Sequence, residues 1–176
     1  MAAVQQAAVI VPAGGGRVME RIGHSKVPQE AFAGGLFVFE GTLEPGRFIP
    51  PHTHSREDEV TVVLSGDLAV DLGGRMEIAF AGAYVIKPRG VRHAMWNHTD
   101  QDTHVVEIHS PGLMEPYYTE LGALFAATDR EEADRQAAIT ALHLRYGIVY
   151  HPELIDEVVL DDGRRPKVTL GGRRLA

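Results

Sequence analysis

The feature that most constrains this 176-residue chain is a series of short β-prone runs between residues 35 and 110. Valine, isoleucine, phenylalanine and threonine dominate the runs, and glycine or proline separates them, as is typical of strands joined by tight turns. Most gaps are too short for a crossover helix, so neighbouring strands have to pair antiparallel. The pattern predicts an all-β sandwich or barrel. The expected strands lie in LFVFEGTL, EVTVVLSG, DLAVDLGG, RMEIAFAG, AYVIKPRG and THVVEIHS.

Two helical patterns follow the strand-rich region, in residues 113–127 and 130–146. Thr128 and Glu131 have the spacing of a capping box before the second helix, and Gly147 is a suitable stop after it. The two helices are too small for a core of their own, so we expect them to pack on the barrel or on a partner subunit.

The domain prediction is a single domain over residues 1–176, with a barrel core at 35–110 and a helical C-terminal extension at 113–147. The N-terminal run MAAVQQAAVIVPAGGG lacks a cationic start, so it is interpreted as a strand and not as a signal peptide. The run HPELIDEVVL, after the helices, predicts a short helical turn followed by a strand.

Composition excludes several classes of function. A formal net charge of −7 disfavours non-specific binding of nucleic acid. The basic segment at 164–174 is interpreted as a solvated tail or edge strand in preference to an anion site. No apolar run is long enough to cross a membrane. The absence of cysteine excludes disulfides, thiolate metal sites and cysteine nucleophiles, and suits a cytoplasmic protein.

Two histidines in the stretch GRFIPPHTHSREDE favour a metal site. His52 and His54 are two residues apart, so on a strand both imidazoles point to one face, about 7 Å apart. Glu59 has the wrong parity to share that face on a continuous strand, so the chain has to turn between Ser55 and Asp58. Glu59 then begins a return strand, from which its carboxylate can face the same point.

A second stretch, GAYVIKPRGVRHAMWN, supplies another histidine, His93, directly after a Pro-Arg-Gly turn. Alternation along a strand would place Met95 and Asn97 on the same face as His93, and Trp96 on the opposite face.

These two stretches resemble the two sequence motifs of the cupin family, and every motif position is matched. The first motif corresponds to Gly46, His52, His54, Glu59 and Gly66. The second corresponds to Gly82, Pro88, Gly90, His93 and Asn97. The resemblance covers about residues 35–110 and implies a double-stranded β-helix, or jelly roll, with one metal in the barrel mouth. It also implies four ligands, which are His52, His54, Glu59 and His93. The helical end is similar to single-domain bacterial cupins of the quercetin-dioxygenase-like kind.

Three neutral imidazoles and one carboxylate suit one divalent transition metal, and the donor set does not choose among Fe, Mn, Ni, Co and Zn. A six-coordinate ion would keep two positions for water, substrate or dioxygen, which is typical of a catalytic site. Glu59 is therefore the candidate catalytic residue, either as a constant ligand or as a transient base. The adjacent Glu57 and Asp58 fit the motif spacing less well.

Other residues near the motifs are weaker candidates. His104 would line the pocket only if its strand parity points inward, and His109 is interpreted as an ordinary surface or core residue. Arg92 is either a holder of an anionic substrate or a solvated side chain. Trp96 is expected to pack outside the pocket. Four residues are either pocket walls or plain core, namely Phe37, Phe39, Tyr84 and Met95.

Three function classes follow from this pattern. The first is a metal-dependent enzyme of dioxygenase type, or an isomerase, decarboxylase or polyketide-tailoring enzyme with the same site. The second is a module that binds a small ligand without turnover. The third is a metal-free scaffold. A small-molecule partner and a homodimer are expected, since a barrel of this type has strand edges to protect.

Overall fold

The computed structural model describes residues 8–127, 131–166, 169–170 and 173–174 of the chain. Its strands are β1 (Arg17–Met19), β2 (Gly23–Val27), β3 (Phe37–Leu43), β4 (Phe48–His54), β5 (Asp58–Ser65), β6 (Asp67–Leu72), β7 (Met76–Phe80), β8 (Tyr84–Lys87), β9 (His93–Trp96), β10 (Thr103–Ser110), β11 (Ile148–Tyr150), β12 (Thr169–Leu170) and β13 (Arg173–Arg174). Its helices are α1 (Glu115–Ala126) and α2 (Glu132–Tyr146), with shorter 3₁₀ turns η1 (Gln29–Phe32) and η2 (Pro152–Glu157).

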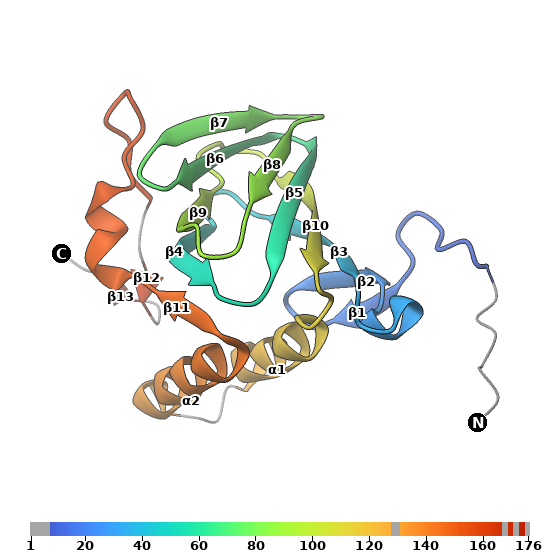
Figure 1. Ribbon diagram of the computed structural model, residues 1–176. Helices are drawn as coiled ribbons and strands as arrows, with labels where there is room; N and C mark the ends of the chain where they lie inside the picture. The colour runs from blue at the N-terminus through green and yellow to red at the C-terminus, as the bar shows by residue number, and fades with distance from the viewer. Residues whose placement is uncertain (1–7, 128–130, 167–168, 171–172, 175–176) are drawn as a thin grey trace.

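Two antiparallel sheets face each other and form the barrel (Figure 1). One sheet has the strand order β1-β2-β3-β10-β5-β8, and the other has the order β11-β4-β9-β6-β7. From β3 to β10 the chain passes repeatedly from one sheet to the other, so long-range pairs such as β3 with β10 close the structure. This arrangement is a double-stranded β-helix, and it confirms the predicted all-β jelly roll with C-terminal helices.

Alternation along the strands fills one half of the barrel with apolar side chains. Every second residue of β10 is buried, and so is every second residue of β5 from Glu59 to Val63. The buried residues face the space between the sheets. The cluster that results contains Leu43, Val63, Leu68, Val70, Ala79, Val85, Met95 and Val105.

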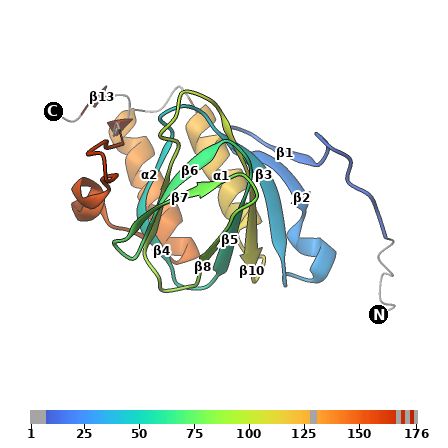
Figure 2. The same cartoon turned by 90° about the horizontal axis from the view of Figure 1, so that it is seen from above.

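The helices α1 and α2 lie side by side across the other end of the barrel (Figures 1 and 2). Their apolar faces share a core with β3, where Phe37 and Phe39 contact a cluster that includes Tyr117, Leu121 and Leu142. After α2, β11 pairs with β4, so that Ile148 is opposite His54 and Tyr150 is opposite His52. The segment that follows α2 is therefore part of the barrel wall. None of the described helices is long and apolar enough to cross a membrane.

Glycines with positive φ shape the turns that the motifs predicted. The motif residues Gly46, Gly66, Gly82 and Gly90 all have φ between +77° and +88°. At Gly66 a Cβ atom would also lie 2.8 Å from the carbonyl oxygen of Asp102. At such positions a larger residue would be strained, which explains the glycine.

The structure corrects several expectations at the chain ends. Residues 8–16 form no strand, since Pro12 and three successive glycines interrupt the apolar run, and residues 1–7 lie outside the described part. No strand follows η2 at residues 158–160. Thr128, the predicted cap, also lies outside the described residues, and α2 has Glu131 at its N-cap without a side-chain hydrogen bond. Gly147 ends α2 with φ of 74°, as predicted.

Candidate metal centre

Three strand ends bring the four predicted ligands to one end of the barrel. His52 and His54 lie at the end of β4, Glu59 lies at the start of β5, and His93 begins β9. The strand register places His52 directly opposite His93. One ligand atom from each of the four side chains can be chosen so that all lie within 4.8 Å of one another. All four side chains are buried. The predicted turn lies between His54 and Asp58, as the parity argument required.

The donor atoms point at a common position. Glu59 Oε2 lies 3.1 Å from His93 Nε2 and 3.3 Å from His54 Nε2. Among the described residues, neither Glu59 Oε2 nor His93 Nε2 has a hydrogen-bond partner. Buried polar atoms are rarely left unpaired in native proteins. A bound cation would satisfy both atoms at once.

The other ring nitrogens set the tautomers that metal binding requires. His52 Nδ1 donates to the Pro50 carbonyl at 2.8 Å, and His93 Nδ1 donates to the Val91 carbonyl at 3.1 Å. A proton on Nδ1 leaves the lone pair of Nε2 free for an ion, which is the usual arrangement of metal-binding histidines. His54 differs, because its Nδ1 faces a carboxylate, that of Glu57, at 3.7 Å.

Protonation states near neutral pH also suit a metal. Burial lowers the pKa of His52 well below its usual value, and burial lowers the pKa of His93 as well. Burial alone would raise the pKa of Glu59, but the ammonium of Lys87 and the neighbouring histidines outweigh burial and lower that pKa well below its usual value. His52 and His93 are therefore neutral near neutral pH, and Glu59 is ionised. With three neutral imidazoles and one carboxylate as ligands, a divalent ion would leave a net charge of about +1.

A buried polar layer lies behind Glu59, and sequence reasoning missed it. Lys87 Nζ contacts Glu59 Oε1 at 2.8 Å and Glu107 Oε2 at 3.2 Å. Thr61 donates to both oxygens of Glu107 at 2.9 Å. Burial raises the pKa of Glu107 to about 8, although Lys87 acts against this shift. Parity along β8 is the signal that could have revealed Lys87, because Lys87 shares a face with the apolar Val85.

His109 is a further buried group beside the site. It lies on β10, its side chain is fully buried, and burial lowers its pKa to about 3. Its Nε2 is 3.2 Å from the Tyr118 hydroxyl, whereas its Nδ1 has no partner among the described residues. Donor atoms of Glu59, Glu107 and His109 also lie within 4.8 Å of one another. The core alternative predicted for His109 agrees with its burial, but its place beside the predicted ligands was not foreseen.

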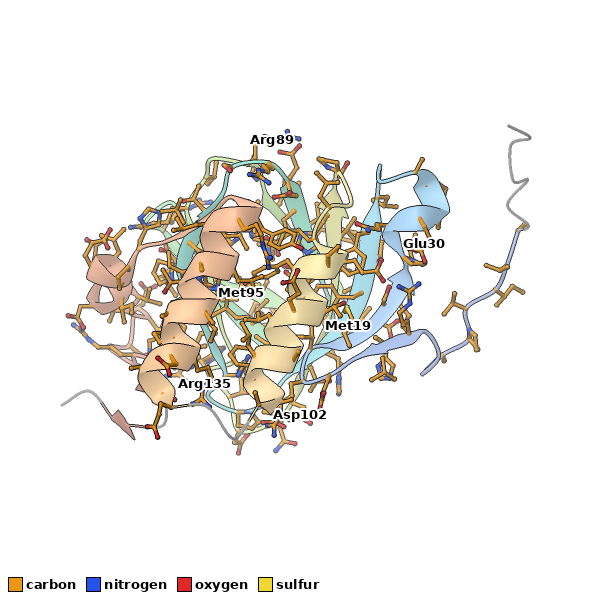
Figure 3. The ribbon with its side chains drawn as sticks, turned by 90° about the horizontal axis from the view of Figure 1, so that it is seen from below. Met19, Glu30, Arg89, Met95, Asp102 and Arg135 are labelled. Atoms are coloured by element: carbon orange, nitrogen blue, oxygen red, sulfur yellow. The ribbon has the colours of Figure 1, made fainter. Side chains whose placement is uncertain are left out.

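Aromatic rings close the barrel end above the ligands. Tyr150 stacks on His52 with ring centroids 5.2 Å apart, and His143 of α2 stacks on Tyr150 at 4.3 Å. The rings of Phe39 and Tyr118 pack together with their centroids 4.7 Å apart. In the view of Figure 3 the two helices lie across this end of the barrel, and the labelled Met95 is seen between them. The C-terminal extension therefore covers the side of the barrel on which the ligands lie.

The weaker candidates fall on both sides of the barrel wall. Tyr84 is 69% exposed, so it is not a pocket wall, and His104 is exposed and bonded to Thr42. Arg92 is paired with Asp71 and Glu157.

Met95 and Trp96 face opposite sides, as alternation predicted. Met95 Sδ accepts from Lys87 at 3.5 Å inside the barrel. Trp96 packs with Ala69 and Leu160, in a cluster that contains none of the four predicted ligands.

Comparison with known proteins identifies the barrel. Residues 39–109 match the family model described as "Cupin domain". These residues form a cupin domain. The matched segment contains all four predicted ligands, so the cupin domain holds a buried histidine and glutamate cluster that could bind a metal. The domain match supports placement in the cupin superfamily. The quercetin-dioxygenase-like subtype stays a prediction, and so does metal binding by the four residues.

Two rice proteins (Oryza sativa subsp. japonica) are similar in sequence to part of this chain. Germin-like protein 1-2 is 32% identical over 100 residues, and the protein named "Putative germin-like protein 3-4" is 37% identical over 81 residues. The alignments cover 52% and 40% of this chain but only 43% and 35% of the relatives. Among solved structures, one described as a predicted oxalate decarboxylase from Thermotoga maritima is 20% identical, with a TM-score of 0.48, and the match covers 49% of this chain and 76% of that chain.

Proposed function

We propose that this protein is a metal-dependent cupin enzyme that acts on a small molecule, with a dioxygenase as the leading class. The observation that carries the proposal is the buried cluster of four donors, in which Glu59 Oε2 and His93 Nε2 have no partner among the described residues. A structural metal site would use all positions of its ion for protein atoms. Four protein donors leave positions of a six-coordinate ion open for a substrate or dioxygen.

The residues that would hold the ion are His52, His54 and His93, each through Nε2, and Glu59 through Oε2. A bound divalent metal (Fe, Mn, Ni, Co or Zn) would supply a Lewis acid and, where the metal is redox-active, a means of using dioxygen. The net charge of about +1 would favour an anionic ligand such as a carboxylate or an enolate.

Contacts within the protein favour a ligand role for Glu59 over a role as base. Lys87 occupies Glu59 Oε1, and the pKa of Glu59 is well below its usual value, so this carboxylate holds a proton poorly. Glu107 is the better candidate for holding a proton, because burial raises its pKa to about 8 and its carboxylate lies beside Glu59. Aromatic rings around this end would keep water away from a bound substrate.

An isomerase or decarboxylase is the second candidate, and the buried layer behind the ligands favours it. Such reactions need proton transfer without an oxidant, and Glu107, a group that can hold a proton because burial raises its pKa to about 8, lies beside Glu59. A polyketide-tailoring enzyme would use the same groups. A module that binds without turnover would need only the ligands.

Metal analysis and oxygen uptake test these alternatives in sequence. We expect purified protein to carry close to one equivalent of a divalent transition metal by mass spectrometry. Steady dioxygen consumption with an enediol or flavonol would support the dioxygenase. Product formation without oxygen uptake would support an isomerase or decarboxylase. Thermal stabilisation by a ligand without turnover across a broad panel would support a binding module. Less than a tenth of an equivalent, with no gain on reconstitution, would contradict the metal function and favour a scaffold.

We also propose a homodimer, for which the outer face of β5 and β8 offers support. The register pairs Val62 with Tyr84 and Val60 with Ile86, so apolar side chains form a continuous stripe there. Leu64, Tyr84 and Ile86 are each more than half exposed. Contiguous apolar surface of this kind is typical of interaction sites. Ultracentrifugation should give a dimer that Ile86→Lys converts to a monomer, whereas Phe32→Lys, an exposed position elsewhere, should not.

A monomeric wild-type protein would contradict the proposed dimer. Cytoplasmic location and the absence of nucleic-acid partners stay predictions from composition.

A further inference from the structure

Lys87 is a buried cation with an unusual position, directly behind a predicted metal ligand. It lies on β8 opposite Glu59 of β5, and its side chain is fully buried. Its ammonium has three neighbours inside the barrel: Glu59 Oε1 at 2.8 Å, Glu107 Oε2 at 3.2 Å and Met95 Sδ at 3.5 Å. A buried ammonium is costly unless it is paired, so these contacts fix where it can lie.

The two oxygens of Glu59 consequently have different surroundings. Oε1 accepts from Lys87. Oε2 has no hydrogen-bond partner among the described residues and lies near the Nε2 atoms of His93, at 3.1 Å, and His54, at 3.3 Å. A carboxylate whose oxygens were equally free could bind an ion through both. Here one oxygen is already used.

Glu107 keeps the ammonium in place from the other side. Its carboxylate accepts from Thr61 through both oxygens at 2.9 Å, and Lys87 lies between it and Glu59. All of these side chains are buried. Rotation of Glu59 to present both oxygens to an ion would break the contact with Lys87 and leave the ammonium with only Glu107 as a charged partner.

We propose that Lys87 is a positioning residue that reserves Oε1 of Glu59, so that Glu59 binds the metal through Oε2 alone. This inference rests on the proposed metal function. Three imidazoles and one carboxylate oxygen fill four positions of a six-coordinate ion, and two stay open. Without Lys87, Glu59 would bind through both oxygens and only one position would stay open. Lys87 thereby sets how many ligands a substrate and co-substrate together can place on the metal.

A simple structural role for Lys87 makes a different prediction. If the ammonium served only to neutralise Glu107 in the barrel, replacing both residues by neutral ones would leave the binding of the metal unchanged. The test therefore uses Lys87→Met together with the double variant Lys87→Met/Glu107→Gln, which removes the pair of charges and keeps similar side-chain volumes. Lys26→Met is the matched control, since Lys26 is also paired with a glutamate, Glu40, at 2.8 Å but lies on β2.

The measurement is the water-proton relaxation rate of each protein after chelator treatment and loading with Mn²⁺, which reports the number of exchangeable waters on the ion. We expect the relaxation enhancement per bound Mn²⁺ to fall to about half in both Lys87 variants, because one of two open positions is taken. The Lys26→Met control should match wild type. Circular dichroism and Mn²⁺ stoichiometry establish that each variant is folded and loaded.

Three outcomes would overturn the inference, and they are distinguishable. Wild-type protein that binds no Mn²⁺ or other divalent metal would remove the proposed function and this inference with it. Wild-type protein that binds the ion, with unchanged relaxation in both Lys87 variants, would overturn the inference alone. Loss of Mn²⁺ binding by both variants while they stay folded would show that Lys87 holds the site together and does not set how Glu59 binds.

Discussion

The two halves of the barrel interior differ in chemistry although the same strands build both. Along β5 the inward side chains change from Val63 to Thr61 and then to Glu59, and along β8 they change from Val85 to Lys87. The apolar half forms a packed cluster, whereas the polar half holds ion pairs and donor atoms that have no partner in the described part of the chain. Strand parity decides which residues face inward, and position along the strand decides which half they enter. Stability and chemistry are thus separated along each strand.

The largest effect is expected from a change to the polar half alone. His93→Ala removes one of four donors, so metal affinity should fall roughly 1000-fold. This loss corresponds to about a quarter of the binding free energy that is typical of a tight divalent site. Metal content after equilibrium dialysis measures this. His104→Ala, at an exposed histidine of the same barrel, is the control and should retain the metal. Full occupancy in His93→Ala would refute the four-ligand site.

A change confined to the apolar half should act on stability. Leu68 is fully buried in the apolar cluster, so Leu68→Ala should lower the free energy of unfolding by about 3 kcal/mol through lost burial and a residual cavity. Urea unfolding measures the loss, and Leu144→Ala, at a leucine that is 67% exposed, should cost far less. Metal stoichiometry should stay at one. A parallel loss of metal from the folded variant would show that the halves are coupled.

A smaller effect on the polar half is expected at Glu57. This carboxylate is buried, neither of its oxygens has a hydrogen-bond partner among the described residues, and His54 Nδ1 lies 3.7 Å away. A carboxylate behind a ligand histidine raises the basicity of the ring, so Glu57→Gln should weaken metal binding about 10-fold. Competition with a chelator measures this.

The matched control for Glu57 is Glu115→Gln. The buried carboxylate of Glu115 accepts hydrogen bonds from the Ser25 hydroxyl and the backbone N–H of Gln29, away from the predicted ligands. Equal metal affinities for the Glu57 variant and wild type would exclude a role for Glu57 behind His54.

The smallest effect is expected at His143, which stacks on Tyr150 over the polar half of the barrel. Burial lowers the pKa of His143 to about 4, whereas an unfolded histidine titrates near 6.5. As pH falls from about 6.5 to about 4, the unfolded chain takes up a proton that the folded protein does not, so this histidine lowers stability in that window and has no effect above it. His143→Phe should therefore reduce the loss of stability at pH 4.5 by on the order of 1 kcal/mol, allowing for partial exposure.

Urea unfolding at pH 4.5 and pH 7.5 provides the comparison for His143→Phe, with His104→Phe as the control at an exposed position. The free energy of unfolding could instead differ between pH 4.5 and pH 7.5 by the same amount in His143→Phe and in wild type. That result would show that His143 lies in solvent and not against Tyr150.

The sequence was sufficient for the parts of the fold that local patterns control. Alternation marked the strands from β3 to β10, and the turn between His54 and Asp58 followed from parity. The motif spacing selected four side chains that the structure brings together. These features depend on residues that are close in sequence, or on strands whose ends the jelly roll brings to the same end of the barrel.

Features that depend on pairing between distant segments could not be predicted. Whether Tyr84 faces inward depends on the register of β8 against β5, and a shift of one residue reverses the face. Lys87 and His109 meet Glu59 only because β8 and β10 flank β5. β11 is three residues long, and nothing in its sequence indicates that it pairs with β4.

The pairing of β11 with β4 has a consequence for the order of events during synthesis. The strand that carries His52 and His54 leaves the ribosome long before the segment that completes its edge. Until Tyr150 emerges, the nascent chain has its histidines on an incomplete sheet, without the ring that stacks on His52. The four-donor site therefore reaches its final environment only after the segment that contains Tyr150 has been synthesised.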